Sequence, residues 1–218
     1  MKILAITDIH GAYNVAEKIL QHETADVVIL GGDLTNVGTV KEVESAIMKF
    51  REHCEKLLCI VGNMDSVHHD DWYKAEGISI NGRGVIIDDV GFFGVSGGPV
   101  SRLKTPYEIS EEEILARSEA GYMMVKSCHR KVFVPHAPPY GTKLDIIHSG
   151  YHVGSTGVRE FIEITKPDVV ICGHIHEGRG RDAIEKTQIV NCGYGNHGCY
   201  AVINIEKDIH IHNKQLPL

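Results

Sequence analysis

Five short aliphatic runs in the chain each end at a polar side chain that can bind a metal ion. The end points are Asp8-Ile9-His10, Gly32-Asp33, Gly62-Asn63, Pro135-His136 and Gly173-His174-Ile175-His176. Residues with helical apolar spacing separate the first three runs, and strands separated by helices imply parallel strands in a sheet covered on both faces. In such α/β sheets, ligands bind just beyond the carboxyl ends of the strands. The pattern therefore predicts an α/β fold in which the five end points can meet in one crevice.

A second sheet is predicted by the middle and the last third of the chain. We expect helices over 12–22, 40–56, 111–128 and 156–165. We expect strands over 3–6, 27–30, 57–61, 78–80, 85–87, 92–95, 131–134, 168–172, 188–191, 201–205 and 209–212, with a hairpin turn at 89–91. Capping boxes mark two of the helix starts, at Thr39 and Ser110. The length predicts a single domain over residues 1–218, with two sheets flanked by helices.

The side chains at the strand ends form a donor set rich in nitrogen and oxygen. Three oxygen side chains and four imidazoles exceed what one tetrahedral metal site uses. A carboxylate such as Asp33 can bridge two metals, and a close metal pair is the arrangement used for in-line attack on phosphate esters. A set without thiolate suits Mn²⁺ first, with Fe, Co, Ni and Zn as alternatives. The alternative is that these are ordinary turn residues that follow a glycine. This alternative fits Asp33 or Asn63 taken alone better than it fits the whole series.

Charge and composition limit the partners. Lysine and arginine number 22 against 29 aspartate and glutamate residues, a net charge of −7, which argues against an extended nucleic acid as ligand. The six cysteines form no CxxC pair, and no apolar run approaches the length of a membrane helix. Only four apolar residues follow Met1-Lys2 before Thr7, so we expect a cytoplasmic protein without a signal peptide. Homo-oligomerisation stays open.

The ordered series of end points, from residue 8 to residue 176, resembles the calcineurin-like metallophosphoesterases. The resemblance implies a four-layer α/β/β/α sandwich of two mixed sheets flanked by helices, with a dinuclear metal centre. By the family pattern, one metal takes Asp8, His10, Asp33 and His176, and the other takes Asp33, Asn63, His136 and His174. Residues 136–141 and 173–178 look closest to a branch of small proteins that includes nucleotide phosphodiesterases.

The third end point departs from the family pattern. The family usually has Gly-Asn-His followed by an acidic residue at this place, whereas this chain has Gly62-Asn63-Met64-Asp65. In the family, the histidine contacts the phosphate and is thought to protonate the leaving group. Methionine donates no proton, and losing a general acid typically costs about 10²–10⁴ in rate. We therefore expect a metal-dependent hydrolase of phosphodiesters or activated phosphate esters, nucleotides included. By sequence position, a histidine that could replace the acid is His68, His69 or His197.

Roles in catalysis and substrate binding are expected for several residues. We expect Asp33, Asn63 and His197 to contribute to catalysis, and Asn63, Arg179 and His197 to bind the substrate. His197 lies in the glycine-rich segment 193–198, where the backbone can approach a ligand closely, and a surface loop is the alternative interpretation. For Arg179 the alternative is a surface position. Residues 68–71 are expected to begin a solvated helix. The loops over 96–108 and 137–155 are expected to shape the pocket.

Two other functions fit the same pattern. Some proteins that resemble this family lack the third-block histidine and act as binding scaffolds, as the retromer scaffold subunit does. This chain keeps all seven expected ligands, which argues for catalysis. An exposed apolar patch of several hundred Å² would argue for a scaffold. A DNA-repair nuclease is the third function, and the acidic charge and the modest length weigh against it.

Overall fold

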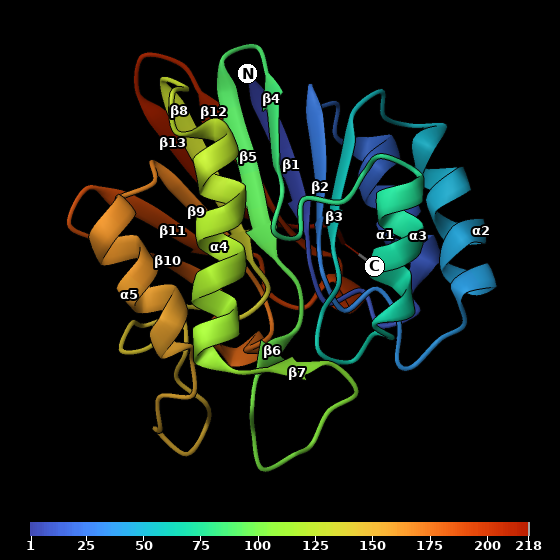
Figure 1. The fold of residues 1–218 in the computed structure, drawn as a ribbon. Helices are drawn as coiled ribbons and strands as arrows, with labels where there is room; N and C mark the ends of the chain where they lie inside the picture. The colour runs from blue at the N-terminus through green and yellow to red at the C-terminus, as the bar shows by residue number, and fades with distance from the viewer. Residues whose placement is uncertain (218) are drawn as a thin grey trace.

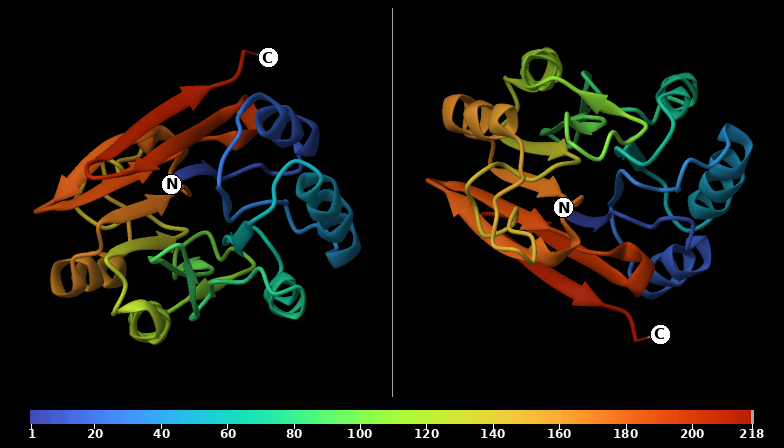
Figure 2. Two further views of the ribbon diagram at one scale, coloured as in Figure 1. Left: turned by 90° about the horizontal axis from the view of Figure 1, so that it is seen from above. Right: turned by 90° about the horizontal axis from the view of Figure 1, so that it is seen from below.

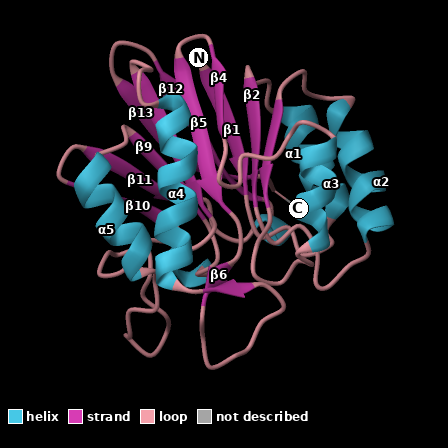
Figure 3. Cartoon of the chain, in the orientation of Figure 1, coloured by secondary structure: helices cyan, strands magenta, loops and turns pink. Residues whose placement is uncertain are grey.

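Two mixed β-sheets lie face to face, with helices on their outer sides (Figures 1, 2 and 3). The computed structural model describes residues 1–217. The first sheet has the order β13-β12-β1-β2-β3, with β1 at Lys2–Ile6, β2 at Val27–Gly31, β3 at Leu57–Ile60, β12 at Cys199–Ile205 and β13 at Ile209–Gln215. Its β1, β2 and β3 are parallel, whereas β12 runs antiparallel to both β1 and β13. The final strands of the chain thus complete the sheet that its first strand begins.

The second sheet has a parallel centre and antiparallel edges. Its order is β10-β11-β9-β8-β5-β4, with β4 at Gly84–Ile87, β5 at Val90–Val95, β8 at Arg130–Pro135, β9 at Val169–Cys172, β10 at Gly180–Ile184 and β11 at Thr187–Asn191. A short parallel pair, β6 at Gly98–Pro99 and β7 at Glu108–Ile109, stands apart. The helices are α1 at Tyr13–His22, α2 at Val40–Arg51, α3 at His68–Ala75, α4 at Glu111–Val125 and α5 at Thr156–Thr165. The predicted α/β fold of two mixed sheets flanked by helices is confirmed.

The alternation of side chains along the strands produces two apolar layers. In β1, Ile3 and Ala5 pack in the cluster between the sheets, together with Phe92 and Val134 of the second sheet. The intervening Leu4 belongs to the cluster that also contains helix residues. Successive strand side chains point to opposite faces, so a strand buried on both sides must be apolar at every position. That requirement explains the aliphatic runs of the sequence.

Helix starts agree with the sequence better than helix ends. Thr39 and Ser110 cap α2 and α4 as predicted, each accepting a hydrogen bond from the backbone N–H three residues on. α2 ends at Arg51 rather than near Lys56, because the Lys56 carbonyl already accepts a bond from Val28 of β2. α4 likewise ends at Val125, short of residue 128, where the chain turns.

Several strand predictions need correction. Residues 78–80 form only an isolated bridge between Cys59 and Ser79 rather than a strand. β10 was not expected, and the segment 96–108 contains β6 where only loop was expected. The hairpin between β4 and β5 exists, but it turns at Asp88 and Asp89, whose φ angles of 48° and 63° fit the favoured two-residue hairpin turn.

The helix start at residues 68–71 is not solvated throughout. His69 and Asp70 are buried. The Asp70 carboxylate accepts hydrogen bonds from Asn81, Ser96 and Tyr107, which compensate its burial. None of the helices in residues 1–217 has the length and apolarity to cross a membrane.

Glu23, which follows the last residue of α1, links that helix to β1 and β13 of the first sheet. Its carboxylate pairs with Lys2 and Lys214 and accepts a bond from the Tyr200 hydroxyl. Burial alone would raise the pKa of Glu23, but the two lysines outweigh it and lower the pKa from 4.5 to about 2. A carboxyl with a depressed pKa in the folded state stabilises the fold at pH values above its unfolded pKa.

We expect Glu23→Gln to lower the free energy of unfolding by about 1–2 kcal/mol at pH 7, a figure reduced for the partial exposure of both lysines. The deficit relative to wild type should shrink as the pH falls from about 4.5 toward 2, because the wild-type carboxyl then becomes protonated. Urea denaturation at pH 7 and pH 3.5 measures it. Glu119→Gln, an exposed position on α4, is the matched control. An equal deficit at both pH values would contradict the assignment.

Candidate metal centre

The seven expected ligands come together at the carboxyl ends of five strands. Strands β1, β2 and β3 are parallel neighbours in the first sheet, and β8 and β9 are parallel neighbours in the second, with the ends of all five at one pole of the molecule (Figure 1). Backbone bonds beyond the strands join the turns, from Asp8 to Gly32, from His10 to Asp33 and from Gly173 to His136. Residues up to 168 positions apart in sequence thus occupy one site.

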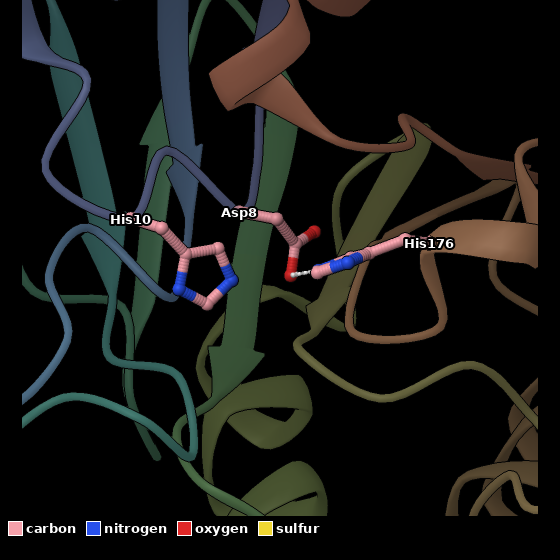
Figure 4. Close-up of side chains that lie close together, drawn as sticks. All are labelled: Asp8, His10 and His176. Atoms are coloured by element: carbon pink, nitrogen blue, oxygen red, sulfur yellow. Dashed lines mark hydrogen bonds and ion pairs between the residues drawn. The ribbon is translucent and has the colours of Figure 1, made fainter.

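The first group of side chains is Asp8, His10 and His176 (Figure 4). Each can offer one ligand atom, and these atoms lie within 4.8 Å of one another. The fully buried Asp8 carboxylate lies 3.3 Å from His176 Nε2 and accepts the backbone N–H of His174. His10 Nε2 is buried and has no hydrogen-bond partner among the described residues. A buried polar atom without a partner is costly, and a cation would satisfy it.

The second group is Asp33, His136 and His174, with ligand atoms again within 4.8 Å of one another. Asn63 adds a fourth donor, because its Oδ1 lies 2.7 Å from His174 Nδ1 and 3.0 Å from His136 Nε2. Asp33, Asn63 and His136 are all buried. Two oxygens and two imidazole nitrogens therefore converge here.

Asp33 connects the two groups. Its Oδ2 lies 3.6 Å from His10 Nε2 and 3.4 Å from His136 Nε2. Its Oδ1 accepts a 2.7 Å hydrogen bond from the backbone N–H of Met64, which fixes the direction of the carboxylate. One carboxylate thus faces ligand atoms of both groups.

The backbone at the site is strained. The φ angles of Asp8, His10, Asp33 and His174 are 55°, 47°, 51° and 64°. This left-handed region costs free energy for residues with a side chain, and such residues gather at functional sites. Glycine is needed beside them for space, because a Cβ at Gly62 would collide with the Asp33 carboxylate. The glycines beside these ligands are thus part of the site.

Hydrogen bonds orient two of the imidazoles. His10 Nδ1 lies 2.6 Å from Asn36 Oδ1, and His136 Nδ1 lies 2.9 Å from the Gly31 carbonyl. A proton on each Nδ1, assigned from these acceptors, turns Nε2 toward the interior of the site. Metal-binding histidines are typically held in this way by an outer partner.

Two histidines of the second group have opposite pKa shifts. Burial would lower the pKa of His136, but the nearby Asp33 carboxylate outweighs it and raises the pKa to about 9. Burial, together with the charge on His136, lowers the pKa of His174 to about 4. His174 is therefore neutral near pH 7, as a ligand must be, whereas a cation bound by His136 would displace a proton.

The residues present fit divalent metal ions. In both groups a buried carboxylate faces imidazole nitrogens. The mixture of carboxylate, amide and imidazole donors suits borderline divalent cations such as Mn²⁺, Fe²⁺, Co²⁺ and Zn²⁺.

A cleft of about 910 Å³ opens above both groups. His10, Asp33, Asn63, His174 and His176 form its polar floor. Met64 also lines it, with segments 99–105 and 147–154 on the sides, as expected of the two pocket loops. Glu111 reaches this cleft, but its carboxylate is occupied by the Ser155 hydroxyl and the first backbone N–H groups of α5.

Two predicted substrate contacts lie elsewhere. His197 is exposed and lines a separate hollow with Gln215, Leu216 and Pro217. Arg179 Nη2 donates to the Lys214 carbonyl and does not line the cleft. The glycine-rich segment 193–198 still reaches the site through Tyr194, whose ring stacks on His176 at 4.2 Å. The His197 ring contacts the Tyr194 ring edge to face, with the ring centroids 4.5 Å apart.

None of the three histidines expected to replace the missing acid, His68, His69 and His197, lines the cleft. His69 is buried with Nε2 3.1 Å from the Gly38 carbonyl, and His68 is exposed outside the cleft lining. The sequence-based reasoning also missed three supporting residues. Asn36 orients His10, Tyr194 packs on His176, and Asp65 accepts backbone bonds from Leu34, Thr35 and Gly62. Only Asp65 had a signal, as an acidic residue that closes the Gly-Asn block.

A family model, a sequence relative and solved structures are similar to this chain. A model of the family described as calcineurin-like phosphoesterase matches residues 1–178. The uncharacterized protein MJ1162 of Methanocaldococcus jannaschii is 34% identical over 195 residues, covering 88% of this chain and 87% of its own length. The crystal structure of TT1561 of Thermus thermophilus superposes with a TM-score of 0.74 at 17% identity, over 97% of this chain and 98% of that one.

A second solved structure with a similar fold comes from a protein described as an anchor. GAP50, the anchor in the inner membrane complex of Plasmodium, superposes with a TM-score of 0.64 at 10% identity, over 99% of this chain and 84% of that one. At such identities the two superpositions show a shared fold.

Proposed function

This chain belongs to the calcineurin-like phosphoesterase family, and we propose that it hydrolyses phosphodiesters or activated phosphate esters, nucleotides among the candidates, at a dinuclear metal centre. The family assignment makes it a metal-dependent hydrolase of phosphate esters. The position of Asp33 carries the proposal of two metals, because its Oδ2 faces His10 of one group and His136 of the other. A bridging carboxylate is what a close metal pair requires.

Each metal would have four protein ligands. Asp8, His10, Asp33 and His176 would hold one cation, and Asp33, Asn63, His136 and His174 would hold the other. When bound, the two cations stabilise charge on a phosphoryl group and lower the pKa of water. We propose Mn²⁺ as the native ion, with Fe, Co, Ni or Zn as alternatives.

The proton donors in the cleft determine which leaving groups can depart. Met64 lines the cleft at the place where the family carries its acid. Apart from the proposed metal ligands, the lining side chains that carry an N–H or O–H are Ser101, Arg102 and Thr105, and the Glu111 carboxylate is occupied by Ser155 and the start of α5. Hydroxyl and guanidinium groups are poor acids near neutral pH. Esters whose leaving group departs without a proton are therefore favoured.

A catalytically weak binding scaffold is the alternative function. The exposed side chains of Val100, Leu103 and Tyr151 beside the cleft favour it, since apolar patches mark interaction sites. The close grouping of the ligand side chains argues against it, because a scaffold has no need for them.

We expect a bis-aryl phosphate diester to be hydrolysed with a kcat/KM at least about tenfold above that of the matching aryl monoester in Mn²⁺. Chelation should abolish turnover of both, and added Mn²⁺ should restore it. Metal analysis of the same sample gives the number of ions bound. Turnover of neither ester, with two ions bound, would favour the scaffold. Preference for the monoester would contradict the assigned substrate class.

A further inference from the structure

Two loops stand on either side of the cleft, at the pole where the strands end. One follows β6 and the other precedes α5, and both project beyond the sheets (Figure 1). Val100 and Leu103 on the first loop are 70% and 84% exposed, and Tyr151 on the second is 71% exposed. These three are the most exposed large apolar side chains in residues 1–217. Such exposure opposes the hydrophobic effect unless a ligand covers the side chains.

The apolar character continues from the loops into the cleft. Beside the polar Ser101, Arg102, Thr105 and Glu111, its lining contains seven apolar side chains, Met64, Pro99, Val100, Leu103, Ile147, Val153 and Ile175. Its floor is the polar metal centre, and the two share one cavity. A ligand that fills this cavity must therefore be charged at one end and apolar along its length.

Buried or bonded carboxylates hold the bases of both loops. Glu108 accepts bonds from the side chains of Ser101 and Thr105, and this fixes the first loop across β6 and β7. Asp145, fully buried, accepts bonds from the backbone of Thr142 and Gly154 at the base of the second. The apolar tips are thus held in place before a ligand arrives, which lowers the entropic cost of binding.

We propose that the substrate is an amphiphilic phosphate ester, whose alkyl or aryl group lies between the loops at 99–105 and 147–154 while its phosphate faces the metal centre. This inference rests on the proposed function and narrows its substrate class. Arg102 lies on the first loop and lines the same cavity, where it can attract an anion. Met64 belongs to the apolar wall, so the residue that replaces the family's acid also contributes contact area.

The test uses alkyl 4-nitrophenyl phosphates with methyl, butyl and octyl groups, each below the concentration at which it self-associates. The leaving group is constant, so only the retained chain varies. Full burial of a methylene corresponds to roughly a fourfold gain, and in an open cleft we expect kcat/KM to rise about 10–100-fold from methyl to octyl. Leu103→Ser should lower this octyl-to-methyl ratio severalfold. Ile164→Ser, a 68% exposed position on α5 that does not line the cleft, should leave the ratio unchanged.

Binding provides a second measurement that does not need turnover. Octylphosphonate should bind the Mn²⁺-loaded protein at least about tenfold more tightly than methylphosphonate by calorimetry, and Leu103→Ser should reduce this difference. Hydrolysis of all three esters at one rate, with equal phosphonate affinities, would overturn the inference and leave the proposed function standing. Failure to hydrolyse any ester would instead overturn the proposed function and with it the substrate claim. The phosphonate affinities would then show only whether the cleft binds an apolar chain beside a phosphonate group. A high ratio that Leu103→Ser does not change would overturn the role of the loops.

Discussion

Replacing Asp33 by asparagine is expected to lower kcat/KM for an aryl diester by at least about 10³-fold and to reduce the bound Mn²⁺ from two ions to one or fewer. The asparagine has the same shape and can still accept the Met64 N–H. It lacks the negative charge that faces His10 and His136, so neither cation keeps its shared ligand. Losing several kcal/mol of charge stabilisation corresponds to a rate loss of that order.

The chain offers a closely matched control. Asp89 also has a left-handed backbone, with a φ of 63° against 51° for Asp33, but it is exposed in the hairpin between β4 and β5. Asp89→Asn should bind two ions and keep full activity. Metal analysis after gel filtration, the rate, and circular dichroism of both variants make the comparison. Two tightly bound ions in Asp33→Asn would show that the carboxylate does not bridge.

The strand ends are where sequence and structure agree best, and the reason is local. A strand buried on both faces is aliphatic throughout, so the first polar residue after it marks the edge of the sheet. The turns at Asp8, Asp33 and His174 have positive φ, and glycine precedes Asp33 and His174 to provide room. These requirements act within a few residues, so the sequence displays them directly.

The supporting residues depend on contacts between distant segments, which the sequence does not display. Tyr194 stacks on His176 because residues 195–196 hydrogen-bond to the turn after β1. The same geometry turns His197 outward, although the glycine-rich segment had singled out the histidine. Asp70 is polar and lies at a helix start, which favours the prediction of a solvated residue. The fold instead buries it, with hydrogen bonds from Asn81, Ser96 and Tyr107. β10 was not predicted because it is an edge strand, and an edge strand can be polar and lack an aliphatic run.

Met64→His is expected to restore activity toward poor leaving groups. The side chain at position 64 lines the cleft beside the metal centre, and its backbone N–H is held by Asp33. An imidazole there can protonate a departing oxygen, which typically contributes about 10²–10⁴-fold when that oxygen is basic. We expect kcat/KM for a phenyl leaving group to rise about 10–100-fold, and that for 4-nitrophenyl to change by less than about threefold, because 4-nitrophenolate departs unaided.

The decisive quantity is the slope of log kcat/KM against the pKa of the leaving group, measured over a series of aryl methyl phosphate diesters. A protein that lacks a general acid should show a steep negative slope, and the imidazole should flatten it, because a proton then neutralises the charge that develops on the oxygen. Met48→His, on an exposed position of α2, controls for an added imidazole outside the cleft and should keep the steep slope. An equally steep slope in Met64→His would mean that position 64 is not the place of the missing acid. A shallow slope already present in the wild type would mean that another group in the cleft supplies the proton.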